Sequence, residues 1–141
     1  MATTGLDTFD TSLQKSNIWL KEIMEDQGWE DRHRAYLALR SVLHTLRDRL
    51  PPDEATDLGA QLPMLIRGLY YEGYKPSGKP TKEHKEQFLS HVSKAFQNDP
   101  EIDPERVVRS VLGLLARRVS EGEIKDVRGS LPKDIHDLWP Q

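Results

Sequence analysis

A stretch rich in glycine and proline in the middle of the chain resembles a phosphate-binding loop. Gly73, Gly78 and Lys79 fit the pattern G-x-x-x-x-G-K, in which backbone N–H groups and a lysine surround phosphate oxygens. The next position should be Ser or Thr to hold magnesium, but it is Pro80, and the residues before the loop have helical rather than strand character. Because prolines at positions 76 and 80 also remove two backbone donors, we predict a turn between two parts of the chain.

Metal and nucleophile chemistry have only incomplete residue sets. Glu30 and His33 form one E-x-x-H pair, but a di-iron bundle needs a second such pair and two further inward glutamates. The sequence shows no strand–Ser–helix elbow that would hold a nucleophilic serine, and the absence of cysteine excludes thiol chemistry. We predict no catalytic residues, no metal site and no cofactor, and we expect the histidines to be solvated or hydrogen-bonded within the fold.

The elements that would position any site come from an internal duplication. Residues 40–70 align with residues 109–139 without a gap, and twelve of these 31 positions are identical. Upstream matches extend the two copies to about residues 15–71 and 84–140, with a linker at 72–83. A period of about 70 residues is too long for a solenoid repeat. We therefore predict a single domain over residues 1–141, built from two tandem four-helix repeats with pseudo-twofold symmetry.

Helical spacing of apolar residues predicts an all-α fold of about eight helices. One stripe in each copy carries this prediction: Leu39, Val42, Leu43, Leu46 and Leu50, and then Val108, Val111, Leu112, Leu115 and Val119. Pro51 and Pro52 end the first of these helices, and Asp103 and Pro104 begin the second. The other predicted helices cover about 9–26, 53–61, 82–97 and 121–129, with one more after each Leu-Pro pair. Ser120 and Glu123 form a capping box.

Aligned positions also carry two packing predictions. Arg49 and Arg118 flank the same corner as the acidic pairs Glu54/Glu123 and Asp57/Asp126, which predicts a salt bridge or cap that fixes this corner. Gly113 aligns with His44 in the middle of a predicted helix. A glycine there costs up to about 1 kcal/mol relative to alanine, so we predict a close helix crossing at Gly113.

Composition limits the partners and the location of the protein. Lys and Arg total 20 and Asp and Glu total 23, which gives a net charge of −3, so the chain lacks the basic surplus of a general nucleic-acid binder. No apolar run approaches the roughly 20 residues of a membrane span, and the first sixteen residues do not show a basic segment followed by an apolar one. We expect a cytoplasmic protein without a membrane partner.

The chain resembles a known bacterial family through the segment that joins its two copies. Gln61-Leu62-Pro63 leads into Arg67-Gly68-Leu69-Tyr70-Tyr71-Glu72-Gly73, and a second Leu-Pro helix follows. These features are similar to the family catalogued as domain of unknown function 2267, and the resemblance covers nearly the whole chain. It implies a small, soluble, all-helical bacterial protein. It implies no reaction and transfers no catalytic residue.

Differences between the copies indicate where function could lie. Positions 67, 68, 71 and 72 depart from their counterparts 136, 137, 140 and 141, and arginine and tyrosine are enriched at binding hot spots. We predict a partner-binding surface, and its residues are Arg67, Tyr70, Tyr71, Glu72 and Tyr74. The alternative is that the first copy simply continues into the linker and that the tyrosines there pack over the second copy.

The favoured function is therefore a protein-interaction module without catalytic activity, whose partner is another protein of unknown identity. A first alternative is nucleic-acid binding by helix-turn-helix-like corners at Leu50–Asp53 and Val119–Glu121. The arginines near these corners are Arg40, Arg47, Arg49, Arg109, Arg117 and Arg118. A second alternative is small-ligand binding or an enzyme with a site between the repeats, which a deep pocket with buried polar groups would indicate.

Overall fold

Eight α-helices and no strand form the regular structure of residues 4–140, which are the residues that the computed structural model describes. Met1–Thr3 and Gln141, which end the predicted domain, lie outside this range. The all-α prediction is confirmed. The helices are α1 (Asp7–Gln27), α2 (Arg32–Asp48), α3 (Pro52–Gly59), α4 (Met64–Tyr71), α5 (Lys85–Lys94), α6 (Pro104–Arg118), α7 (Glu121–Gly129) and α8 (Lys133–His136).

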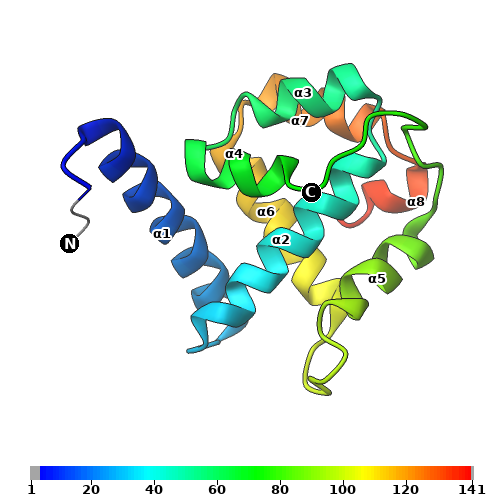
Figure 1. Ribbon diagram of the computed structural model, residues 1–141. Coiled ribbons are helices and arrows are strands. Elements are labelled where there is room, and N and C mark those ends of the chain that lie inside the picture. The colour runs from blue at the N-terminus through cyan, green and yellow to red at the C-terminus, as the bar shows by residue number, and fades with distance from the viewer. Residues whose placement is uncertain (1–3, 141) are drawn as a thin grey trace.

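The centre of the fold is the pair α2 and α6, which contact each other and most of the other helices (Figure 1). Both predicted apolar stripes face this centre, and each of their ten side chains is at most 5% exposed. The helices α3 and α7 lie side by side at one end, while α1 packs on α2, α4 and α6 and extends outward at its start. Two pairs of corresponding helices from the predicted repeats thus contact each other, α2 with α6 and α3 with α7, although the pseudo-twofold relation itself stays a prediction.

Local signals fix most helix ends. Asp103 accepts a hydrogen bond from the backbone N–H of Glu105 at 3.1 Å and begins α6, and Pro52 occupies the first turn of α3. The predicted capping box of α7 is only half formed. Ser120 accepts from the N–H of Glu123 at 3.3 Å, but the N–H of Ser120 donates to Oε1 of Gln61 at 2.9 Å. The second half of the cap therefore comes from the end of α3 instead of from Glu123.

The close helix crossing predicted at Gly113 is wrong. A Cβ atom placed on Gly113 would meet only Nη1 of the Arg117 side chain, at 3.4 Å, and no backbone of another helix. The predicted turn at Gly73 and Gly78 does use glycine, because both residues have positive φ, at 72° and 80°. No helix within residues 4–140 has the length and apolar character needed to cross a membrane.

Candidate functional site

Two residues of the predicted partner-binding surface are structural. Arg67 donates to the carbonyl oxygens of Gly59, Ala60 and Leu62 at 2.9–3.1 Å, so its cation satisfies the C-terminal end of α3. Tyr70 has no exposed surface and donates its hydroxyl to the carbonyl of Ala55 at 2.7 Å. Burial raises the pKa of Tyr70, which keeps this hydroxyl protonated as a donor. The structure thus removes Tyr70 from the surface that a partner could reach.

Tyr71 and Tyr74 contact residues of the first copy, so the predicted packing of these tyrosines over the second copy is wrong. The ring of Tyr71 packs edge-on against Tyr70 at 5.0 Å, and its hydroxyl lies 3.4 Å from the carbonyl of Thr56. The Tyr74 ring lies 5.3 Å below the guanidinium of Arg47. Tyr71 and Tyr74 keep some exposed surface, so partner binding by them stays a prediction.

Glu72 is the acidic member of the predicted surface. Its carboxylate accepts from Nη2 of Arg40 at 3.0 Å, and its side chain remains 60% exposed. Its backbone carbonyl accepts from Arg47 at 2.7 Å. Glu72 therefore lies at the surface beside α2 and α4, with its carboxylate paired to Arg40.

The arginines proposed for nucleic-acid contact are all engaged. Arg47 and Arg49 are 5% and 4% exposed, and their guanidinium groups bond to internal carbonyls and carboxylates. The other four each lie within 4.0 Å of a carboxylate: Arg40 with Glu72, Arg109 with Glu105, and Arg117 and Arg118 with Glu22. The predicted salt bridge with the acidic pairs at the corner is wrong, because Arg49 pairs with Glu83 and Arg118 with Glu22. The predicted cap is present in the first copy, where Arg49 donates to the carbonyl of Thr45 at 2.7 Å near the end of α2.

The acidic partners in that prediction contact each other instead. Carboxylate oxygens of Glu54, Glu123 and Asp126 lie within 4.8 Å of one another between α3 and α7. Burial, together with the hydrogen bond and charge of Glu54, raises the pKa of Glu123 to about 8. One buried oxygen on each glutamate has no other hydrogen-bond partner, so a proton shared by the two carboxyl groups would satisfy both. These three side chains are also the ones that could hold a cation.

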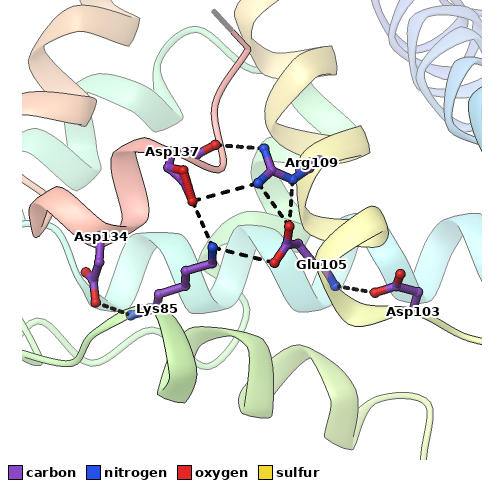
Figure 2. A network of polar contacts seen from close by, with 6 residues as sticks. All are labelled: Lys85, Asp103, Glu105, Arg109, Asp134 and Asp137. Atoms are coloured by element: carbon purple, nitrogen blue, oxygen red, sulfur yellow. Dashed lines mark hydrogen bonds and ion pairs between the residues drawn. The ribbon is translucent and has the colours of Figure 1, made fainter.

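An exposed ionic network ties α5, α6 and the end of the chain together (Figure 2). Nζ of Lys85 lies 2.8 Å from Asp137 and 3.5 Å from Glu105, and Arg109 joins the same two carboxylates. The hydrogen bond with Asp137 raises the pKa of Lys85 and lowers that of Asp137. Asp134 accepts from the first N–H of α5, on Lys85, at 3.1 Å. Every group here has its counter-charge, so the network positions helices and leaves no free charge for chemistry.

The histidines are also occupied by local contacts. His33 stacks on Tyr36 with ring centroids 5.7 Å apart. His44 bonds to the carbonyl of Leu69 at 2.7 Å, and burial lowers its pKa. His91 lies 3.3 Å from Glu83, beside a hollow of about 510 Å³ between α2, α5 and the linker. The predicted alternative of a ligand site between the repeats would lie at this hollow, but its buried cation Arg49 is already paired with Glu83.

An apolar groove runs between α1, α2 and α4, and the residue patterns did not predict it. Two hollows, of about 520 and 370 Å³, share Leu65 and Gly68 of α4. The larger is lined by Leu20, Tyr36, Leu39 and Leu69, and the smaller by Phe9, Leu13 and Met64. Gly68 lines both hollows, and a Cβ placed on it would meet no atom within 4 Å, so the surface is open where the two hollows adjoin.

The contacts of α4 explain why apolar side chains remain exposed in the groove. Ser12 of α1 accepts a hydrogen bond from the backbone N–H of Leu65 at 2.8 Å, so α1 caps the start of α4. Behind α4, Ile66 and Tyr70 are buried in the core. Met64 and Leu65 lie on the side of α4 opposite to these buried residues. They therefore face outward, and they are 48% and 53% exposed. The sequence signal for the groove was a pair of apolar residues outside the buried stripe.

Within residues 4–140, the fold and these contacts define a small all-helical protein with an apolar groove beside α4, paired surface charges and a cluster of three carboxylates between α3 and α7. In a comparison with protein families, the family described as "Uncharacterized conserved protein (DUF2267)" matches residues 16–138 of the chain. The chain therefore belongs to the DUF2267 family, as its Gln-Leu-Pro segment indicated. No curated protein matches the chain.

Proposed function

We propose that this protein is an interaction module that holds an amphipathic helix of a partner protein in the groove between α1, α2 and α4. The observation that carries the proposal is a row of four large apolar side chains along the groove. Phe9, Tyr36, Met64 and Leu65 are each 37–53% exposed. Side chains of this size are rarely left so exposed in one contiguous patch unless a partner covers them.

The exposed area suits a protein partner. Four half-exposed side chains of this size present on the order of 400 Å² of apolar surface. A standard interface covers about 800 Å² on each partner, of which somewhat over half is apolar. The groove therefore offers about the apolar share of one complete interface.

The dimensions favour a helix as the occupant. From Phe9 to Leu20 the groove follows α1 for eleven residues, about 17 Å at 1.5 Å per residue, or three helical turns. A three-turn helix with apolar residues at i, i+4, i+7 and i+11 matches this length. Asp7 and Asp10 stand in the first turn of α1, and the hydrogen bonds from Thr4 lower the pKa of Asp10 and keep it charged. A basic residue at that end of the partner helix would complement them.

The predicted segment from Arg67 to Tyr74 supports this site from behind and from one side. Arg67 and Tyr70 fasten α4 to α3, which holds Leu65 in place. Glu72 lines the larger hollow at its edge, where it is paired with Arg40. This ion pair would supply the polar rim that protein interfaces usually have.

Site-specific photocrosslinking in the host cell tests the proposal. A benzoylphenylalanine replaces Leu65 in one variant and Ile18 in a control variant, because Ile18 is 47% exposed but lies on the other side of α1. We expect a protein adduct at position 65 only, with the crosslinked peptide showing helical apolar spacing. The peptide, made synthetically, should bind wild type and lose at least about tenfold in affinity to Leu65→Glu, but not to Ile18→Glu.

Three results would overturn the proposal. Equal amounts of adduct at both positions would show that partner proteins contact this surface without preference for the groove. An adduct that joins two copies of this chain at position 65 would assign the groove to a second copy. The third is a crosslinked peptide that binds Leu65→Glu as tightly as wild type.

The alternatives receive less support from the contacts. Nucleic-acid binding needs free cations on one face, but the six arginines at the corners are buried or paired. An enzyme between the repeats needs an activated group, whereas the hydroxyl of Thr45, which lines the hollow between α2 and α5, bonds to the carbonyl of Ser41 at 2.7 Å.

A further inference from the structure

A hollow on the side of α1 away from the groove has basic residues in its lining. Its volume is about 370 Å³, and it lies between α1, the connection from α3 to α4, and the end of α6. Among the described residues, no carboxylate lines it. The hollows of about 410 and 510 Å³ differ in this respect, because acidic side chains line both of them: Asp26 in the first, and Asp48 and Glu83 in the second.

Two cations that line this hollow have no carboxylate partner. Lys15 of α1 is exposed and forms no ion pair within residues 4–140. Arg67 of α4 forms none in that range either, because its guanidinium bonds to three neutral backbone carbonyls at the end of α3. Arg118 also lines the hollow, but its charge is engaged by Glu22 at 2.7 Å. The positive charges of Lys15 and Arg67 are therefore uncompensated.

The second copy shows that the carbonyl bond of Arg67 does not require an arginine. His136 aligns with Arg67 and bonds to the carbonyl of Leu131 at 3.0 Å, as Arg67 bonds to the aligned carbonyl of Leu62 at 2.9 Å. What the arginine adds is a permanent charge and the nitrogen Nη1, which makes no hydrogen bond within residues 4–140. Arg67 is thus a cation fixed by backbone carbonyls, with one donor nitrogen to spare.

An exposed apolar side chain lies in the same hollow. Ile18 is 47% exposed and follows Lys15 by three residues, so the two side chains are neighbours on one face of α1. Pro63, on the wall formed by the connection before α4, is partly exposed. A ligand in this hollow would therefore meet positive charge and accessible apolar surface together.

We propose that this hollow binds a small phosphate monoester, with its phosphate group between Lys15 and Arg67 and its organic part against Ile18. A phosphate monoester carries about two negative charges near neutral pH, which matches the two uncompensated cations, whereas one carboxylate would leave a cation unpaired. Both the arginine fork and the lysine ammonium recognise phosphate oxygens. The volume lies within the range of small-molecule sites, about 300–1,000 Å³.

Nuclear magnetic resonance titration of the full-length protein at about pH 8, where histidine is neutral, tests the site. Phenyl phosphate is the main probe. Benzoate carries one charge on the same ring, inorganic phosphate is the anion alone, and phenol is the ring without a charge. We expect phenyl phosphate to shift the Nε–H signal of Arg67 and the methyl signals of Ile18, with a Kd of about 1 mM or tighter. The other three probes should bind more weakly.

Variants separate this site from nonspecific charge effects. Lys15→Gln removes one of the two cations from an exposed position and should weaken phenyl phosphate binding about tenfold. The matched control is Lys94→Gln, because Lys94 is also exposed and without an ion pair within residues 4–140, but lines the hollow between α2, α5 and the linker. Its Kd should equal that of the wild type.

Arg67→His tests the second cation with the residue that the second copy uses. A neutral imidazole keeps a donor for the carbonyl of Leu62 but lacks the charge, so phenyl phosphate binding should again weaken about tenfold. Since Arg67→His could disturb folding, Lys15→Gln decides the matter where that variant fails to fold.

Several outcomes would overturn this inference. They are no shift at Arg67 or Ile18 with phenyl phosphate, equal losses in Lys15→Gln and Lys94→Gln, and binding of benzoate or inorganic phosphate as tight as that of phenyl phosphate. A short single-stranded DNA that binds more tightly than phenyl phosphate would assign the two cations to nucleic acid instead. None of these results bears on the groove, because Leu65 does not line this hollow.

Discussion

Glu123→Gln should make the protein more stable at alkaline pH and leave its stability nearly unchanged in mild acid. Glu123 faces Glu54 between α3 and α7, and its pKa is raised to about 8 from a usual value of 4.5. Between these values the folded chain keeps a proton that the unfolded chain releases. The free energy of unfolding of the wild type should therefore fall as pH rises through this window and level off above about pH 8. Glutamine is neutral at every pH and keeps an amide donor for Glu54.

The size of the effect follows from the length of that window. Each pH unit in which folding retains one extra proton changes the free energy of unfolding by about 1.4 kcal/mol. Glu123 is not fully buried, so water screens part of its interaction with Glu54, Asp57 and Asp126. We expect a loss of about 1–3 kcal/mol for the wild type between about pH 5 and pH 9, and most of it should disappear in Glu123→Gln.

Urea unfolding followed by circular dichroism at several pH values measures this directly. Glu121→Gln is the matched control, because it removes an exposed carboxylate from the first turn of the same helix. Its pH profile should run parallel to that of the wild type. Parallel profiles for wild type and Glu123→Gln would refute the shared proton. A rise in the wild-type melting temperature with millimolar calcium, absent from Glu123→Gln, would instead show that the three carboxylates hold a cation.

Three further substitutions test the packing. Gly113→Ala should raise the free energy of unfolding by up to about 1 kcal/mol in urea titrations, since the added Cβ meets only Arg117; a lower stability would show a close contact that the structure lacks. Tyr70→Phe should cost about 1 kcal/mol by the same measurement, because the buried carbonyl of Ala55 loses its donor. Arg67→Ala should cost about 1–3 kcal/mol, because three carbonyls at the end of α3 lose a charged donor. Arg67→His should recover part of this loss, and equal melting temperatures for the two Arg67 variants would contradict the capping role.

Features that depend on local chemistry were predictable from the sequence. The apolar stripes of α2 and α6, the cap at Asp103 and the turn at Gly73 and Gly78 depend on spacing, on a side-chain acceptor or on positive φ, and all are present. The short α5 was less predictable. The expected start was residue 82, but the helix begins three residues later, after the N-cap residue His84. Its start depends on the bond between the backbone N–H of His84 and the side chain of Gln87.

Contacts between distant residues were not predictable from spacing alone. Arg67 differs from its counterpart His136, and this difference indicated function. In the structure, Arg67 bonds to the carbonyl of Leu62 and His136 bonds to the aligned carbonyl of Leu131, at 2.9 and 3.0 Å. Two different side chains thus serve the same structural purpose. A comparison of residue types cannot detect such an equivalence, because the donor atoms are similar while the residues are not.

The same limit explains why the acidic corner was misread. Glu54 and Glu123 are identical residues at aligned positions, and opposite charges nearby made a salt bridge within each copy the natural expectation. If two copies associate about a twofold axis, however, a residue near the axis meets its own counterpart. A duplicated glutamate placed there must then face a like charge, and protonation of one carboxyl group relieves the repulsion. The pair between α3 and α7 is therefore what a duplicated acidic residue would produce near the predicted axis, and the pH dependence of stability follows from that placement.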